Sequence, residues 1–189
     1  MTCIAGLVDK KGNIWIGGDH ETSWAYTKQN LSTPKVFTNG EFLFGGCGRG
    51  LGNQILNHIF SPPKRLEGQT DMQYLLNTFR ASLVRCMADS GLLENDKGQE
   101  SFDFMFLMGY RGKLYTVGGD GSVVHSDRPF HSIGSGGEVA IGYLHALFDS
   151  NTDLSPKKMI KKAIKAASMT SQGVNDRVTV LKLATEQYN

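Results

Sequence analysis

The hydrophobic pattern of the first nineteen residues predicts a β-hairpin that begins almost at the N-terminus. Two apolar runs, residues 4–8 and 14–18, flank a polar turn that contains Gly12. Such a pair of runs around a glycine-containing turn is typical of two antiparallel strands. Asp19 follows the second run directly, so an acidic side chain is expected at the end of this hairpin.

The rest of the chain divides into strand-like runs and segments of helical periodicity. Strands are predicted at 35–37, 41–44, 102–109, 113–117, within 123–133, and at 177–183. Helices are predicted at 51–60, 70–90, 137–148 and from Ser155 through the lysine-rich segment that follows. The polar stretches 20–34 and 92–101 show little periodicity, which predicts connections without regular structure.

Helix ends carry local signals. Thr70 and Gln73 have the spacing of a capping box, and Gly91 stands where a C-terminal glycine is expected. Ser155 is predicted to be the N-cap of the last helix, with Pro156 at its first position.

The order of the predicted elements is strands, two helices, strands, two helices and a strand. Two facing sheets with a pair of helices on each outer face would bury the apolar runs, so we expect an α+β fold, a four-layer αββα sandwich. A length of 189 residues fits a single domain, residues 1–189.

Composition narrows the function classes. The net charge of +2 makes no case for nucleic acid or an anionic membrane as a partner. Apolar runs are too short to span a membrane and no leader pattern precedes the first strand, so a cytoplasmic location is expected. Cys3, Cys47 and Cys86 lack the spacing of metal ligands, which predicts no metal site and suits a reducing compartment.

Thr2 is the first candidate for chemistry. Removal of Met1 would leave Thr2 with a free α-amine whose pKa is near ~7.7–8.0, able to take the proton of its own nucleophilic hydroxyl. The alternative from these two residues alone is an initiator Met followed by an arbitrary Thr.

Other motifs each have two interpretations. The glycine-rich turns 45–50 and 134–137 precede helices and could offer an oxyanion hole, or be ordinary tight turns. Asp19 and Lys35 could form a charged pair beside a nucleophile, or an ordinary surface ion pair. The lysines of residues 157–165 follow one helix face, which could dock an acidic partner or simply be solvated. The five histidines show no triad or metal pattern.

Taken together and in order, these blocks resemble the proteasome β-type and HslV-like peptidases, which are N-terminal nucleophile hydrolases. The blocks are Thr2 and residues 16–19, 34–36, 44–48 and 133–137, and the resemblance covers nearly the whole chain. It implies that Thr2 is the nucleophile after Met1 removal and that Asp19 and Lys35 tune it. It further implies that Gly45 donates the backbone N–H of the oxyanion hole and that Ser135 orients the amine and a water.

The resemblance also implies a substrate pocket and partners. The pocket positions fall on Thr22, Thr33, Leu43 and Cys47, which would suit small or medium apolar side chains. The partners implied are copies of the chain in a ring or double ring, an AAA+ unfoldase and polypeptide substrates, with no nucleic acid and no membrane. No cofactor is expected in this chain, since ATP would be hydrolysed by the unfoldase; the resemblance is compatible with a structural monovalent cation.

The family has an Asp after the last long helix, and this chain departs from that pattern. Met169 or, in a shifted register, Ser168 stands at that position, with Ser171 aligned to the family's Ser in the second case. The missing carboxylate and Met1 keep open a catalytically inactive ring or scaffold protein. A third alternative is an amidohydrolase of the same chemistry that acts on a small amide.

Overall fold

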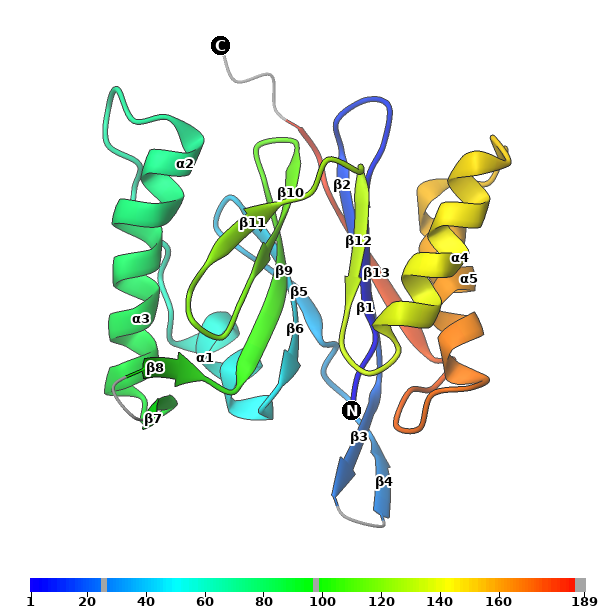
Figure 1. Cartoon of the computed structure of the whole chain (residues 1–189), viewed down its shortest axis with the longest axis horizontal. Coiled ribbons are helices and arrows are strands. Elements are labelled where there is room, and N and C mark those ends of the chain that lie inside the picture. The colour runs from blue at the N-terminus through cyan, green and yellow to red at the C-terminus, as the bar shows by residue number, and fades with distance from the viewer. Residues whose placement is uncertain (25–26, 97–98, 186–189) are drawn as a thin grey trace.

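The computed structural model describes residues 1–24, 27–96 and 99–185. Two antiparallel sheets lie face to face, and helices cover the outer face of each, so the chain is a four-layer αββα sandwich (Figure 1). The first sheet has the order β12 (Phe130–Ile133), β1 (Ile4–Val8), β2 (Ile14–Asp19), β13 (Val178–Leu183). The second has the order β11 (Val123–His125), β10 (Lys113–Val117), β9 (Phe104–Tyr110), β6 (Phe42–Gly48), β5 (Val36–Asn39).

The two helical layers come from separate parts of the chain (Figure 1). One layer contains α1 (Gly50–His58), α2 (Asp71–Gln73), a π-helical segment (Tyr74–Phe79) and α3 (Arg80–Asp89). The other contains α4 (Gly137–Asp149) and α5 (Pro156–Ser168). None of the helices among the described residues is long and apolar enough to cross a membrane.

Three apolar clusters hold the layers together. An aromatic-rich cluster lies between the second sheet and its helices, and includes Phe42 stacked on Tyr110 at a centroid distance of 4.6 Å. A cluster of smaller side chains, including Ala163 and Ala167, lies between the first sheet and α4 and α5. The third, around Ile4 and Ile16, fills the space between the sheets. Burial of these apolar side chains is the main stabilising contribution to the fold.

The structure differs from the sequence prediction in two connections. Segment 20–34 forms a hairpin of β3 (Glu21–Trp24) and β4 (Thr27–Asn30), which projects from one end of the sandwich (Figure 1). Segment 92–101 contributes β7 (Leu93–Asp96) and most of β8 (Gln99–Phe102). Neither hairpin was predicted, because a polar strand pair outside the main sheets has no alternating hydrophobic pattern to reveal it.

The helix predicted at 70–90 is continuous but contains the π-helical segment, and the Thr70–Gln73 capping box is present. Ser155 is the N-cap residue of α5, as predicted, but its hydroxyl makes no capping hydrogen bond. Pro156 lies in the first turn of the helix, as predicted.

Candidate active site

Thr2 lies two residues before β1, where the backbone is held from two sides. The Cys3 amide donates to Asp19 Oδ1 at 2.8 Å, and the Asp19 amide donates to the Cys3 carbonyl at 3.3 Å. The Gly136 amide donates to the Thr2 carbonyl at 3.2 Å. The hairpin β1–β2 and the turn before α4 therefore fix Thr2 in a buried position.

Asp19 and Lys35 form a buried ion pair beside the Thr2 hydroxyl. Lys35 Nζ lies 2.9 Å from Asp19 Oδ1 and 3.1 Å from Oδ2, with side chains 5% and 0% exposed. The same Nζ donates to Thr2 Oγ1 at 2.9 Å. Burial lowers the pKa of Lys35, and the neighbouring Asp19 carboxylate opposes that change. A cation in this place stabilises negative charge on the Thr2 oxygen.

Ser135 contacts Thr2 from the turn between β12 and α4. The Thr2 backbone N–H donates to Ser135 Oγ at 3.2 Å, and Ser135 Oγ lies 3.3 Å from the Thr2 carbonyl oxygen. Gly134 makes this approach available, because its φ is +90° and a Cβ there would lie 2.3 Å from the Thr2 carbonyl oxygen. Only glycine fits such a position.

Met1 is attached in this structure, so the Thr2 nitrogen is a peptide nitrogen. The Thr2 hydroxyl donates to the Met1 carbonyl oxygen at 2.6 Å, and Lys35 Nζ lies 3.3 Å from the same oxygen. The Met1 side chain packs against Gly173, where a Cβ would lie 2.4 Å from Met1 Cβ. The free amine that the proposed chemistry needs is therefore blocked in this form of the chain.

The segment after α5 brings no carboxylate to the cluster. Met169 is 80% exposed, and the Ser168 hydroxyl donates to the Lys165 carbonyl at the end of the helix. Gly173 of this segment packs against Met1. Among the described residues, Asp19 is the carboxylate hydrogen-bonded within the cluster.

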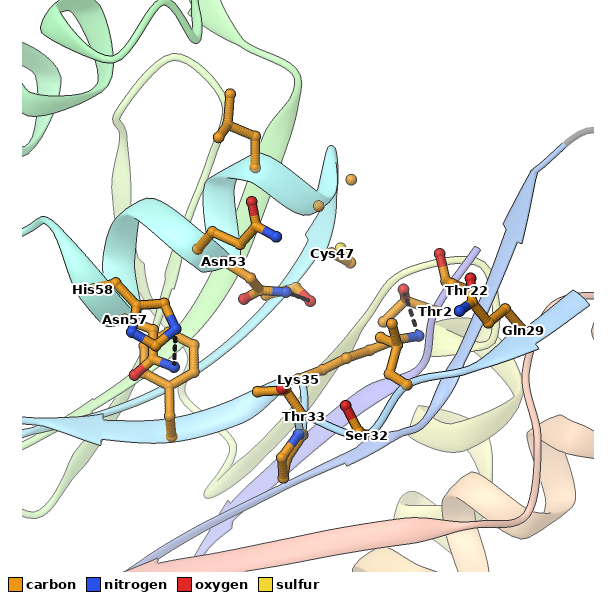
Figure 2. Close-up of a pocket in the computed structure, with 18 of the residues that line it drawn as sticks. Thr2, Thr22, Gln29, Ser32, Thr33, Lys35, Cys47, Asn53, Asn57 and His58 are labelled. Carbon is orange, nitrogen blue, oxygen red and sulfur yellow. Dashed lines mark hydrogen bonds between the residues drawn. The ribbon is translucent and has the colours of Figure 1, made fainter.

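A cavity of about 630 Å³ opens beside Thr2 and extends to α1 (Figure 2). Of the four predicted pocket residues, Thr22, Thr33 and Cys47 line it. Leu43 does not: it is fully buried in the cluster between the sheets, four residues deeper in β6 than Cys47. The substrate-binding role of Leu43 therefore stays a prediction; Cys47 reaches this cavity because it lies near the end of β6.

The wall of the cavity opposite β5 is a polar face of α1 that sequence reasoning missed. It consists of Asn53, Gln54, Asn57 and His58, and Phe37 lines the same cavity from β5. Their spacing along the helix, with apolar Ile55 and Leu56 between them, indicates an amphipathic helix. That pattern predicts a polar face but not that the face borders a cavity.

The amides of β6 alternate between the two neighbouring strands. The Gly46 amide donates to the Lys35 carbonyl at 3.4 Å, toward β5, and Gly45 pairs with Leu107 on β9. In an antiparallel ladder successive amides point to opposite sides, so the Gly45 amide faces β9, away from the cavity. Gly46 and Gly48 line the cavity and Gly45 does not. The Gly46 amide therefore has the Lys35 carbonyl as its acceptor, and the oxyanion role implied for the Gly45 amide stays a prediction.

Two thiols lie close to the site. Burial raises the pKa of Cys3 to about 12 and that of Cys47 to about 11. Both therefore stay protonated at neutral pH and are poor nucleophiles. All three cysteines are free, and the described residues contain no group of His, Cys, Asp and Glu side chains that could hold a metal ion.

Comparisons with known proteins agree with this architecture. Residues 92–183 match the proteasome subunit family. The chain is 28% identical over 178 residues to the ATP-dependent protease subunit HslV of Caldicellulosiruptor saccharolyticus, covering 92% of this chain and 94% of that protein. The HslV of Aquifex aeolicus is 26% identical over 175 residues, covering 92% and 93%.

A solved structure supports the fold over the whole chain. Thiobacillus denitrificans BPH in complex with epoxomicin superposes with a TM-score of 0.79 at 18% identity, covering 97% of this chain and 99% of that one. The order of layers, the sequence relatives and this structural neighbour agree: the chain is similar to proteasome subunits and to HslV proteins and shares the fold of this structural neighbour.

Proposed function

We propose that this chain is the threonine peptidase subunit of a ring-forming, ATP-dependent protease, and that Thr2 becomes its nucleophile when Met1 is removed. The observation that carries the proposal is the contact of Lys35 Nζ with Thr2 Oγ1 at 2.9 Å inside a buried ion pair with Asp19. A buried, paired ammonium aimed at a hydroxyl is an arrangement that activates a nucleophile.

The first step is attack by Thr2. The α-amine freed by loss of Met1 takes the proton of the Thr2 hydroxyl, while Ser135 holds the amine through the contact now made with the Thr2 nitrogen. The Thr2 oxygen then bonds to the carbonyl carbon of the scissile peptide. Lys35 stabilises the oxygen as its proton leaves, and Asp19 keeps Lys35 in place.

The negative charge of the tetrahedral intermediate requires a hydrogen-bond donor on the cleft side of β6. We assign this role to a backbone amide of residues 45–48, and the Gly46 amide would have to leave its 3.4 Å bond to the Lys35 carbonyl to take it. Collapse breaks the C–N bond, and the Thr2 amine gives its proton to the leaving amine. The product of this half-reaction is an ester on Thr2.

Hydrolysis of the ester completes the cycle. The Thr2 amine takes a proton from a water, the water oxygen bonds to the ester carbon, and the Thr2 oxygen leaves and recovers the proton. Every group used is a side chain, an amine or a backbone amide of this chain, so the proposed chemistry calls for no cofactor.

The substrates we propose are polypeptides that bind in the cavity lined by Thr22, Thr33 and Cys47. We further propose that copies of the chain form a ring in the cytoplasm and that an AAA+ unfoldase supplies unfolded substrate at the expense of ATP. The description of the relatives as ATP-dependent protease subunits supports this part of the proposal.

The test is a peptide-cleavage assay on two forms of the chain whose intact masses are known, one with Met1 and one beginning at Thr2. We expect the form beginning at Thr2 to cleave peptides and the form with Met1 to be inactive. Thr2→Ala should reduce cleavage by about 10⁴-fold or more, and the exposed Thr170→Ala should leave it unchanged.

Other outcomes favour other functions. Cleavage of small amides but never of peptides would replace the peptidase by a small-amide hydrolase. Assembly into a ring with neither activity in the Met1-free form would favour the inactive scaffold, for which the absence of a carboxylate from residues 168–173 is the relevant observation.

A further inference from the structure

His20 is buried at the base of the hairpin β3–β4, and the proposed mechanism does not use it. The residue is 3% exposed, and its ring bridges two parts of the chain. Nδ1 lies 3.0 Å from the Leu31 carbonyl oxygen, and Nε2 lies 2.7 Å from Thr179 Oγ1 on β13. One side chain therefore joins the end of this hairpin to an edge strand of the first sheet.

The partners of the ring determine which of its nitrogens carries a hydrogen. A carbonyl oxygen only accepts, so Nδ1 carries a hydrogen and donates to the Leu31 carbonyl. A hydroxyl both donates and accepts, so Thr179 satisfies Nε2 whether or not that nitrogen is protonated. The contact with Leu31 is therefore made in both charge states of the ring.

Leu31 begins one wall of the cavity beside Thr2. Residues 31–34 line the cavity and have no regular secondary structure (Figure 2). Ser32 and Thr33 are exposed, so neighbouring side chains cover them little. His20 holds both peptides of Leu31: the Leu31 amide donates to the His20 carbonyl at 2.7 Å, and the Leu31 carbonyl accepts from the His20 ring. The ring thus fixes the peptide that leads into the wall.

The hairpin itself gives this wall little support. β3 and β4 form a separate two-stranded sheet that projects from the sandwich, and the residues of β4 are exposed (Figure 1). A two-stranded hairpin alone is at best marginally stable in water. Attachment at the base is therefore needed to position it. Asn175 adds to that attachment, since its Oδ1 accepts from the His20 amide at 3.1 Å and its Nδ2 donates to Asn30 Oδ1 at 2.7 Å.

The opposite end of the wall has attachments of its own. Lys35 pairs with Asp19 through Nζ, and β5 begins at the next residue. Asp19 is in turn fixed by hydrogen bonds with the backbone of Cys3 in both directions. Loss of the His20 ring should therefore loosen the wall while the charged pair beside the nucleophile keeps its place.

From these contacts we infer that His20 is a positioning residue for substrate binding, whose ring holds the wall 31–34 in the arrangement that accepts a peptide. The inference rests on the proposed peptidase function. When a wall is in its competent arrangement for only a fraction of the time, the apparent affinity for the substrate falls by that fraction. The rate of the chemical step on bound substrate changes less, because Asp19 and Lys35 are held independently.

Two substitutions of His20 separate its two contacts. Nδ1 of histidine and Nδ2 of asparagine are both bonded to Cγ, so the amide of His20→Asn retains a donor for the Leu31 carbonyl and is too short to reach Thr179. In His20→Gln the amide lies one bond further out, near the place of Nε2, so it keeps the contact with Thr179 and loses that with Leu31. The variants are matched, since each puts a neutral amide in place of the ring.

The kinetic experiment measures peptide cleavage by both variants in the form that begins at Thr2. For His20→Gln we expect KM to rise about 10-fold with kcat changed by less than about threefold, as for a wall that is competent about a tenth of the time. His20→Asn should keep KM within about twofold of the parent, because the Leu31 contact is restored. Equal KM values for the two variants would overturn the inference, and so would a fall of kcat at constant KM in His20→Gln.

Thr179→Val is the control for the outer contact. It removes the hydroxyl that Nε2 meets and leaves the bond from Nδ1 to Leu31 in place. Thr179 lies on β13, outside the set of described residues that line the cavity. We expect a lower melting temperature, because a buried ring nitrogen loses its partner, with KM and kcat close to those of the parent. A KM as high as that of His20→Gln would overturn the inference, because the link to β13 would then position the wall.

A second measurement decides the inference even if the chain proves to have no peptidase activity. Hydrogen–deuterium exchange of the segment 28–33, without any ligand, should be faster in His20→Gln than in the parent, in His20→Asn and in Thr179→Val. Unchanged exchange in that segment would show that the His20 ring does not hold Leu31. Loss of all peptide cleavage in the parent would refute the proposed function and leave this readout intact.

Discussion

The candidate site has two halves that are built differently. The nucleophile half contains Thr2, Asp19 and Ser135 on the first sheet and the turn before α4, and its polar contacts lie between 2.6 and 3.3 Å. The cleft half lies on β6 and α1. It has a 3.4 Å bond from the Gly46 amide to the Lys35 carbonyl, and the buried Oδ1 of Asn53, which lines the cavity from α1, has no hydrogen-bond partner within the described part of the chain.

This difference shows how the two tasks of such a site are divided. Charge stabilisation depends on groups that are already oriented before the reaction. The nucleophile half is accordingly buried in the sandwich, and hydrogen bonds hold its polar groups in place. The cleft half has to admit and release a peptide, so it lies at the end of a ladder and along an exposed helix face. Lys35 belongs to both halves, since it lines the cavity and contacts Thr2.

Lys35→Met is the substitution that breaks the link between the halves, and it has the largest expected effect. Removal of the ammonium leaves the Asp19 carboxylate buried without its cation, which costs about 3–5 kcal/mol of stability. We expect peptide cleavage to fall by at least about 10²–10³-fold as well, because the stabilising charge at Thr2 is lost. Denaturant unfolding and the peptide assay measure the two effects.

The matched control is Lys161→Met, on the exposed face of α5. It should change the free energy of unfolding by no more than about 0.5 kcal/mol and leave cleavage unchanged. If Lys35→Met behaved like this control, the ion pair would be dispensable and the division of the site into two linked halves would be wrong.

The nucleophile half was the more predictable half from the sequence. Its residues flank strands whose apolar runs are clear, and the structure brings Thr2, Asp19, Lys35 and Ser135 together. The layer order was predictable for the same reason, because strand and helix periodicities differ. The hairpin β3–β4 was not, since polar strands carry no such pattern.

The cleft half depends on single-residue register, which composition and periodicity do not determine. A shift by one residue in β6 reverses the side to which an amide points. The amides of Gly45 and Gly46 therefore face different neighbouring strands. The same strand places Leu43 between the sheets and Cys47 at the cavity. The unpartnered atom of Asn53 is visible only in three dimensions.

Gly134→Ala disturbs chiefly the nucleophile half, with a smaller expected effect on stability than Lys35→Met. Its φ of +90° is strained for alanine, and the new Cβ would lie 2.3 Å from the Thr2 carbonyl oxygen. We expect a loss of about 2–4 kcal/mol and a marked fall in kcat, because Thr2 has to move.

Gly142→Ala is the matched control for that substitution. Gly142 lies inside α4, and a Cβ there would meet no atom within 4 Å. Alanine should therefore stabilise the helix by about 0.5–1 kcal/mol and leave kcat unchanged. Equal kcat values for the two variants would show that the turn at Gly134 does not position Thr2.

The pKa of the Cys47 thiol reports whether water reaches the cleft half of the site. Its expected contribution to the free energy of unfolding is the smallest of the three effects. Burial raises its pKa from 9.0 to about 11, so the folded state retains a proton that the unfolded chain loses. The contribution to stability is therefore complete below pH 9 and is lost as the pH rises through 11, by at most about 2.7 kcal/mol at 1.36 kcal/mol per pKa unit.

The measurement is the free energy of unfolding from pH 8 to pH 11 in the parent and in Cys47→Ala. The difference between the two proteins should shrink over this range, because the variant lacks the titrating group and the other titrations cancel. A constant difference would mean that the Cys47 thiol ionises as readily in the folded protein as in the unfolded chain. Water would then reach the floor of the cleft, and both halves of the site could not share the low-dielectric environment that the Lys35 contact requires.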